Sequence, residues 1–538
     1  MGYALMWVES LAAALVLVAL VAALAAPWRF GRRAGPILAA VGLFGLAAAA
    51  TAGVCYFHLR LDAHPVSNPH SIALIAWTLF LAVGSAVLLA RGLRRPGPES
   101  VPGARSWSRP KLALAFGGLV AVTAITLANM DLAVKIQFTA VRAEAGAKLL
   151  AQIPPRLPDA QNAAVVYQEA FDYLAPPDHV PPAWQDKAPA AWKQYDRSAL
   201  DPKDKDLREF LHTQERGLAL VRKAAAMPAC SFDHDYSLGI SMPLPELKRL
   251  PHAAMLLAYD ARVKAADGDA RGALADVAAI YGVAGHVSDP LLLAVAVAAG
   301  IDATGTRVLE DVLAQIAPAD LGRPALPGEP HYHRAVRRAM ATEDVIFGLT
   351  TFASLAEGDQ GVIDAAGEWM SAPSLAVLGS PIYRVFFLRD DLAAYRRVMR
   401  DMQDLAAKPY FEARPDWQAL DQSWRQNRRG IVTALLAPAT ERVVTTANEA
   451  DAGRLLARAA LALMAYRAKT GAYPDKLDAL VPEYLPRVPL DPFSGRPLRL
   501  KRDGTGVVIY SVGRDLADDG GRPAEPGKPG GDLVFRLP

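Results

Sequence analysis

The stretch MLLAYDARVKAADGDARGALADVAAIYGVAGHV, residues 255–287, decides how the middle of this 538-residue chain folds. Its apolar residues recur at steps of three and four, which is the spacing of one face of an α-helix. The pattern is broken at Ala-Asp-Gly-Asp, residues 266–269, a combination that favours a tight turn. We therefore predict two helices joined by a short turn, with small residues along their contact.

The sequence on both sides of this helical hairpin is also predicted to be mainly helical. The apolar run DPLLLAVAVAAG, residues 289–300, is too short to cross a bilayer, so we interpret it as buried core. No second copy of the hairpin recurs at a fixed period, which argues against a helical repeat array. Residues 136–446 are therefore predicted to form one irregular, mainly helical domain. Proline removes a helical N–H donor, so its clusters mark loops, at residues 154–158, 176–182 and 324–330.

The N-terminal region, residues 1–135, is predicted to contain four transmembrane helices. Four apolar runs are long enough to cross the hydrocarbon core, at residues 4–26, 36–57, 72–90 and 112–130. The first basic residue, Arg29, follows the first run, whereas a signal peptide has its basic residues before the run. Ionisable residues are almost lacking from the runs, with Glu9 near an outer end. This composition favours a membrane anchor over a transporter or sensor.

The loops between these runs predict the orientation of the chain. Two of the three loops are rich in basic residues: Arg29, Arg32 and Arg33 in the first, and Arg91, Arg94, Arg95, Arg105, Arg109 and Lys111 in the third. Basic loops stay in the cytoplasm. Both termini, and everything after about Asp131, are therefore predicted to lie on the extracytoplasmic side of a bacterial inner membrane.

Composition limits the partners and the chemistry that the chain is expected to have. With 58 basic and 55 acidic residues the net charge is +3, so no strong field attracts nucleic acid. The two cysteines, Cys55 and Cys230, are far apart and in unlike surroundings, which predicts neither a disulfide nor a thiolate metal site. Sequence motifs for a serine nucleophile, a zinc protease or a phosphate-binding loop are also lacking.

Two clusters of the middle region are candidates for a chemical role. Asp233, His234 and Asp235 offer carboxylate and imidazole groups that suit a divalent ion, although adjacent residues rarely converge on one ion. The alternative, which we favour, is a loop that caps a helix. His331 and His333 precede a predicted helix start and are expected at the surface.

The C-terminal residues 447–538 show a different pattern, which predicts a small α+β domain. A helix is indicated up to about Thr470 and Gly471, because apolar residues step by four and three at Ala452, Leu456, Ala459, Leu463 and Tyr466. Short alternating runs at 497–500 and 507–510, with Asp503-Gly504 between them, predict an antiparallel hairpin. The sequence DLVFRL, residues 532–537, predicts a last short strand.

This part of the chain contains five motifs in a fixed order: Y-R-x-x-x-G-x-Y-P, L-x-x-L, D-P-F-S-G, Y-S-V-G-R-D and D-D-G-G. Their order resembles that in the globular domain of the major pseudopilin of type II secretion systems. The matching residues are Tyr466, Arg467, Gly471, Tyr473, Pro474, Asp491, Pro492, Gly495, Tyr510, Ser511, Gly513, Asp515, Gly520 and Gly521. The four predicted spans and the long middle region depart from that family. What the resemblance implies is therefore a fold, and not assembly into a pilus.

The resemblance also implies a calcium site. A late aspartate-rich loop binds calcium in that family, and the corresponding residues of this chain are Asp515, Asp518, Asp519 and Asp532. Calcium takes six to eight oxygen ligands and tolerates irregular loops. The alternative is an Asp/Gly turn without an ion, since both residues favour turns for local backbone reasons.

Three hypotheses for function follow from these observations. The favoured one is a non-enzymatic, membrane-anchored extracytoplasmic protein that binds an envelope or secretion-system component. The second is a metal-assisted hydrolase that uses Asp233, His234 and Asp235. The third is a transporter or sensor that works through its membrane region. The uncharged spans and the lack of catalytic motifs favour the first.

Overall fold

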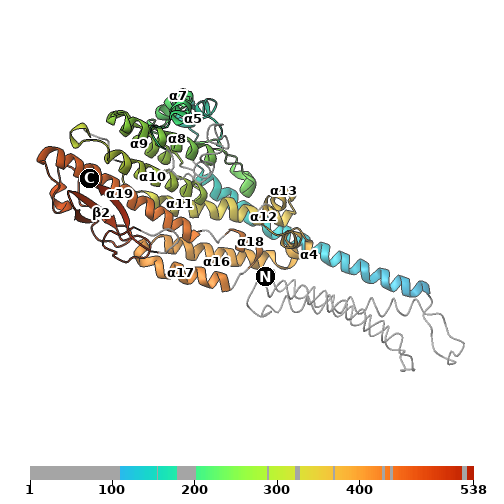
Figure 1. Ribbon diagram of the computed structural model, residues 1–538. Coiled ribbons are helices and arrows are strands. Elements are labelled where there is room, and N and C mark those ends of the chain that lie inside the picture. The colour runs from blue at the N-terminus through green and yellow to red at the C-terminus, as the bar shows by residue number, and fades with distance from the viewer. Residues whose placement is uncertain are drawn as a thin grey trace, which may run out of the picture.

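The computed structural model describes residues 109–153, 156–177, 201–287, 290–321, 327–367, 370–426, 430–436, 440–523 and 530–538. These residues form a mainly helical molecule with one three-stranded antiparallel sheet near the C-terminus (Figure 1). The mainly helical and the small α+β parts of the predicted fold class are thereby confirmed. The first three predicted spans and most of the basic loop residues lie outside the described residues.

The predicted helical hairpin is confirmed. Helix α8 covers Glu246–Ala266 and helix α9 covers Ala270–His286, with Asp267, Gly268 and Asp269 between them. Gly268 has a φ of +82°, a left-handed conformation that glycine adopts without steric penalty. Asp269 caps α9 by accepting a hydrogen bond from the Gly272 N–H at 2.9 Å. Neighbouring residues alone fix this turn, so it could be predicted from the local sequence.

Further helices pack around this hairpin. Helix α7 contacts α5, α8 and α9, and helix α10 contacts α8, α9 and the later helix α19. Their bounds are α5 (Ala163–Phe171), α7 (Lys205–Ala225) and α10 (Leu292–Leu313). Short 3-10 turns connect the helices at η1 (Asp159–Gln161), η3 (Tyr236–Ser241) and η4 (Pro318–Leu321).

Helix α10 confirms that the apolar run at residues 289–300 forms buried core. Among the residues whose side chains are described, α10 is the one helix of membrane-spanning length and hydropathy. Yet 56% of that apolar stretch is buried within the protein. Leu291, Ala294 and Val295 are all nearly inaccessible to solvent. Helix α10 is therefore a core helix of the middle region.

A second group of helices begins with a continuous segment that contains a π-helical turn. It consists of α11 (Tyr332–Glu343), η5 (Asp344–Leu349) and α12 (Thr350–Glu357). In η5, a Cβ atom on Gly348 would lie 2.1 Å from Tyr395 Oη, so glycine is needed for the close approach of that ring. The remaining helices are α13 (Gln360–Ala366), α14 (Ala372–Leu378), α15 (Pro381–Phe386), α16 (Leu388–Ala406), α17 (Tyr410–Gln426) and α18 (Ile431–Leu436).

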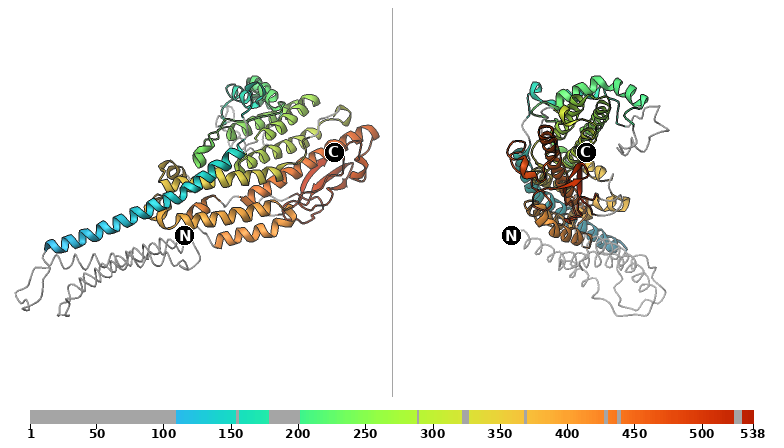
Figure 2. Two further views of the ribbon diagram at one scale, coloured as in Figure 1. Left: turned by 180° about the vertical axis from the view of Figure 1, so that it is seen from behind. Right: turned by 60° about the vertical axis from the view of Figure 1, so that its left-hand side comes forward.

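The long helix α4 connects this body to the predicted membrane region. It covers Arg109–Gln152, 44 residues, and is about 66 Å long at 1.5 Å per residue. Its C-terminal half packs on α12, η5 and α15. Its N-terminal half, which includes the predicted fourth span at residues 112–130, projects from the body (Figures 1 and 2). The helix is confirmed, and its passage through a membrane stays a prediction.

Helix α19, Thr440–Thr470, joins the middle region to the sheet. It packs on α10, α11 and α17, and also on two strands of the sheet. It ends before Gly471, which has a φ of +82°, so the predicted helix end is confirmed. The boundary predicted between residues 446 and 447 falls inside this single helix.

The predicted strands are confirmed as an antiparallel sheet in the order β1-β2-β3. Strand β1 covers Arg499–Asp503, β2 covers Gly506–Ser511 and β3 covers Leu533–Leu537, and the turn η6 (Leu477–Leu480) precedes them. Ile509 of the buried central strand β2 lies opposite Leu500 and Phe535. We refer to residues 471–538, which follow α19 and include this sheet, as the C-terminal unit.

Candidate functional site

A cavity of about 640 Å³ lies between the helical region and the C-terminal unit. One side is formed by the start of α11, the start of α17 and helix α19, and the other by the loop before β1. The lining residues are Glu329, Pro330, His333, Arg334, Pro409, Tyr410, Phe411, Asn448, Asp451, Leu455, Arg458, Leu485, Pro486, Arg487, Pro489, Leu490, Asp491, Pro492 and Gly495. Segments that are far apart in the sequence thus share one site.

Asp451 of α19 fixes the start of α11 at the edge of this cavity. Its carboxylate accepts hydrogen bonds from the backbone N–H groups of His331 at 2.8 Å, Tyr332 at 3.1 Å and His333 at 3.2 Å. These are N–H groups at the start of a helix, which have no partner within the helix. The partial positive charge at the helix start stabilises the negative charge of Asp451. Because Asp451 is only 4% exposed, a ligand in the cavity cannot reach its carboxylate.

A buried ion pair holds α19 against α10 behind this wall. Arg454 binds Asp302 through two hydrogen bonds, one of them 2.9 Å long between Nη2 and Oδ1. Both side chains are almost fully buried. Burial raises the pKa of Asp302 to about 6, against the lowering effect of the Arg454 charge. Since α19 carries lining residues of the cavity, this pair fixes the position of one cavity wall.

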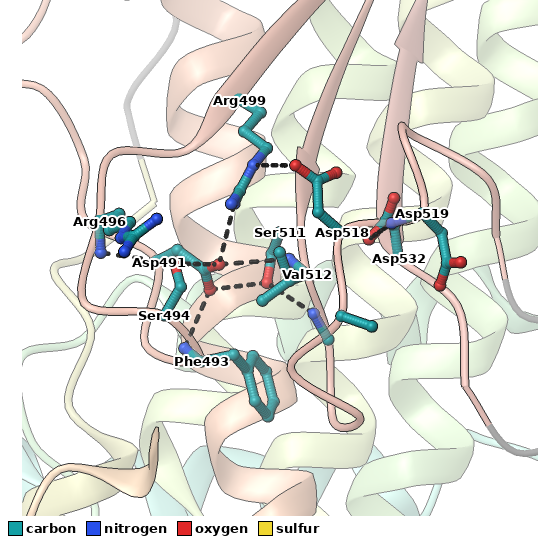
Figure 3. Close-up of polar contacts among 12 residues, drawn as sticks. Asp491, Phe493, Ser494, Arg496, Arg499, Ser511, Val512, Asp518, Asp519 and Asp532 are labelled. Carbon is teal, nitrogen blue, oxygen red and sulfur yellow. Dashed lines mark hydrogen bonds and ion pairs between the residues drawn. The ribbon is translucent and has the colours of Figure 1, made fainter. Parts of the chain in front are cut away.

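Asp491 holds the opposite wall of the cavity in place (Figure 3). Its carboxylate is 1% exposed and accepts hydrogen bonds from two backbone N–H groups and two hydroxyls. The donors are the N–H groups of Phe493 at 3.0 Å and Val512 at 3.2 Å, and the hydroxyls of Ser494 at 2.9 Å and Ser511 at 2.7 Å. The D-P-F-S-G turn is thereby tied to strand β2.

Gly495 brings this turn against the helical region. Its φ is +66°, and a Cβ atom there would lie 2.8 Å from the ring of Phe411 on α17. Any larger residue would push the two walls of the cavity apart. Asp491, Pro492 and Gly495 also carry the resemblance to the pseudopilin domain, so this part of the motif lines the cavity.

Among the described residues, the charged groups of this cavity that are exposed and have no ion-pair partner are arginines. Asp451 and Asp491 are buried, and Glu329 pairs with Arg458 at 2.5 Å. Arg334 and Arg487 are exposed, and within the described residues neither forms an ion pair. An unpaired guanidinium has five N–H donors in a planar arrangement that matches a carboxylate or phosphate.

The other lining groups are mainly apolar. Five prolines, at positions 330, 409, 486, 489 and 492, line the cavity together with Phe411 and Leu490. Leu490 is 56% exposed. The Tyr410 hydroxyl is within 3.1 Å of the Thr445 hydroxyl, and burial lowers the pKa of His333. Apolar walls with a few polar groups are typical of a binding site.

Asp233, His234 and Asp235 are turned toward three different partners. The Asp233 carboxylate lies 3.7 Å from the Arg156 guanidinium, and His234 Nε2 lies 3.4 Å from a carboxylate oxygen of Glu246. Asp235 accepts a hydrogen bond from the Ser237 N–H at 3.0 Å and caps the turn η3. Among the described residues, no group of three or more His, Cys, Asp or Glu side chains is placed to hold a metal ion.

His331 and His333 lie at the start of α11, as predicted, since that helix begins at Tyr332. Both are half-buried rather than fully on the surface. The His331 ring stacks on Tyr332 with 4.4 Å between ring centroids. The sequence did not reveal this environment because Asp451, which binds their backbone, lies far along the chain.

The four aspartates of the predicted calcium site lie in the loop between β2 and β3 and next to it. Figure 3 shows three of them, Asp518, Asp519 and Asp532. Asp532 is 2% exposed and accepts hydrogen bonds from the N–H groups of Asp519 at 3.3 Å and Gly521 at 2.6 Å. Asp515 accepts from the Gly531 N–H at 3.0 Å. These contacts close the loop with backbone donors.

Asp518 has a different partner. Its carboxylate lies 2.8 Å from Arg499 Nε on strand β1 and accepts a hydrogen bond from the Gly520 N–H at 3.0 Å. Asp519 is close to Arg522, with 3.7 Å between the charged groups. The structure therefore brings Asp518, Asp519 and Asp532 into one loop, and calcium binding there stays a prediction.

Most of the residues that form the cavity carry no recognisable signal in the sequence. Arg334, Arg487, Tyr410 and Phe411 belong to no motif, whereas His333 and the D-P-F-S-G turn were candidates from the sequence. No protein-family model, no curated protein and no solved structure matches the chain, so the cavity is interpreted from its own geometry.

Proposed function

We propose that this chain is a membrane-anchored, extracytoplasmic binding protein that holds an anionic segment of a partner protein in the cavity. The observation that carries the proposal is the pair Arg334 and Arg487. They come from the two regions that form the cavity, both are exposed, and within the described residues neither has an ion pair. A carboxylate on the partner would supply the missing charge through bidentate hydrogen bonds.

The size and walls of the cavity support a segment of protein chain as the ligand. A volume of about 640 Å³ falls within the range of about 300–1,000 Å³ that is usual for ligand sites. The prolines, Phe411 and Leu490 offer apolar contacts for side chains next to the carboxylate. Burial of apolar area supplies affinity, while the two arginines supply selection by charge.

The anchor and the compartment complete the proposal. The basic loops of the predicted membrane region support an orientation in which the large C-terminal part lies outside the cytoplasm. The projection of the apolar half of α4 from the body is compatible with a fourth span at residues 112–130 (Figure 2). The pseudopilin-like pattern of the C-terminal unit makes an envelope or secretion-system protein the favoured partner.

Photo-cross-linking in native membranes tests the binding site. A photoreactive residue replaces Leu490 at the cavity, and the matched control carries it at Leu293, which is also 56% exposed but does not line the cavity. We expect a protein adduct from position 490 that is lost in the Arg334→Gln, Arg487→Gln double variant and reduced but still present with lysine at both positions, because lysine keeps the charge and cannot form bidentate hydrogen bonds. Equal adducts at 490 and 293, or an adduct that survives the glutamine substitutions, would contradict the proposal.

A reporter fused after Pro538 tests the compartment. A reporter that is active only outside the cytoplasm is expected to be active in this fusion, because both termini are proposed to lie outside. The reciprocal fusion to a reporter active only in the cytosol serves as the control. Activity of the cytosolic reporter alone would overturn the extracytoplasmic assignment and with it the envelope partner.

A further inference from the structure

The short helix α15 is fixed to α4 at the end of the predicted fourth span. The apolar run ends at Met130, and Asp131 follows it directly. Asp131 Oδ1 lies 2.6 Å from Arg384 Nε of α15, and its other oxygen lies 2.8 Å from Lys135 Nζ. Since α15 also packs on α4, its depth relative to the apolar run is set by this contact.

An apolar face of α15 is left without a protein partner in the described structure. Ile382 is 52% exposed, and Val385 and Phe386 are half-buried but do not belong to the hydrophobic core of the body. Their spacing of three and four residues places the three side chains on one face of the helix. Tyr383 and Phe387, on the other side, pack with the core.

Helix α4 has exposed apolar residues at the same level. Leu132 is 55% exposed and Ile136 is 62% exposed. At 1.5 Å per residue they lie about 3 Å and 9 Å beyond Met130. The headgroup layer of one leaflet is about 5–8 Å thick. This is half of the difference between the thickness of the whole bilayer and that of its hydrocarbon core. Both residues therefore fall in or next to that layer if the run at 112–130 spans the membrane.

We propose that α15 lies in the headgroup layer of the bilayer. Lipid covers its apolar face, so that Ile382, Val385 and Phe386 contact the acyl chains. The inference rests on the proposed span at residues 112–130, which belongs to the proposed function. Lipid is favoured over a second protein because Leu132 and Ile136 of α4 are exposed at the same level, directly after the apolar run. Amphipathic helices bury their apolar face at this boundary and keep charged residues, here Arg384, on the polar side.

Fluorescence quenching by lipid tests this placement in the full chain. Cys55 and Cys230 are replaced by alanine, and single cysteines at Ile382 or Phe386 are labelled with an environment-sensitive dye. The labelled protein is reconstituted into phosphatidylcholine vesicles that contain lipids with a spin label near the headgroup or deep in the acyl chain, so that both the headgroup layer and the bilayer centre are sampled. Ala121 in the proposed span is the positive control, and the exposed Leu293 on α10 is the negative control.

We expect the dyes at positions 382 and 386 to lose most of their fluorescence to the quenching lipid, while the dye at 293 loses none. Quenching at 121 without quenching at either 382 or 386 would overturn the placement of α15 and leave the span intact. An unquenched dye at 121 would overturn the span, and therefore both the proposed anchor and this inference. The two failures are thus distinguishable.

Discussion

Buried carboxylates are neutralised differently in the helical region and in the C-terminal unit. In the helical region, Asp302 is bound by Arg454, and Asp276 by Arg222 and Lys264. In the C-terminal unit, Asp491 and Asp532 accept hydrogen bonds mostly from backbone N–H groups of loops. The two carboxylates within helices are thus held by cations, whereas the two in the loops of the C-terminal unit are held mainly by N–H and hydroxyl donors, with Arg499 only at 4.0 Å from Asp491.

The difference follows from where backbone donors are free. Inside a helix each N–H is already bonded to a carbonyl four residues earlier, so only loops and helix starts have N–H groups to offer. Two further aspartates of the helical region fit this explanation. Asp451 binds the N–H groups at the start of α11, and Asp391 binds those of Val432 and Thr433 at the start of α18.

The largest effect is expected when a cation of the helical region loses its partner. In Asp302→Ala, Arg454 stays buried, at 4% exposure, without a counter-charge. We expect the free energy of unfolding of the full chain in detergent to fall by about 3–5 kcal/mol, measured by denaturant titration. The double variant Asp302→Leu, Arg454→Met removes both charges and should lose far less. Equal losses in the two variants would contradict an ion-pair explanation.

A smaller loss is expected when a carboxylate of the C-terminal unit is removed. Asp491→Ala leaves the buried Ser511 hydroxyl and Val512 N–H without acceptors, and we expect a loss of about 2–3 kcal/mol. The nearby Arg499 guanidinium, 4.0 Å from Asp491, keeps Asp518 as a counter-charge at 2.8 Å, so no cation is left without a partner. The control is Asp475→Ala, since that side chain is 89% exposed and should contribute less than about 0.5 kcal/mol. A similar loss in both variants would argue against the hydrogen-bond network.

The pH dependence of stability sharpens the comparison at Asp276. Burial raises the pKa of Asp276 to about 6 in the folded protein, above its ordinary value of 3.8, despite the nearby Arg222. The folded state therefore binds the proton more tightly. The contribution of Asp276 to the free energy of unfolding is fully present below about pH 4. This contribution, about 1–3 kcal/mol, is lost as the pH rises through about 6.

Unfolding of the native chain and of Asp276→Asn at pH 4 to 8 measures this effect. The difference between the two free energies of unfolding should change over that interval, because the amide does not titrate. A native chain that becomes more stable relative to the variant as the pH rises through 6 would show that the pKa is lowered, and the predicted sign would be wrong.

The smallest effect is expected from calcium at the aspartate loop of the C-terminal unit. Backbone N–H groups already bind Asp532 and Asp515, so an ion replaces existing contacts as well as adding new ones. We expect calcium added after EDTA treatment to raise the free energy of unfolding by about 1 kcal/mol. Asp519→Asn should abolish the rise, and Asp503→Asn, in the β1-β2 turn, should not. A chain that does not respond to calcium would contradict the predicted site.

Features that depend on neighbouring residues could be predicted from the sequence. The α8-α9 hairpin, the end of α19 at Gly471 and the β1-β2 hairpin each follow from local periodicity and a turn. The cavity could not be predicted in this way. Asp451 meets His331 from 120 residues away, and Gly495 meets Phe411, without any periodic signal in the sequence. Contacts of this kind are set by how whole helices pack.

Helix α4 continues without interruption from its projecting apolar half into the packed body. A continuous helix has no hinge at which a change of angle could be absorbed. If the apolar half tilts to match a thinner bilayer, the whole body must swing with it as a rigid lever. Membrane thickness would then set how far the cavity, at the distant end of that lever, stands from the lipid surface.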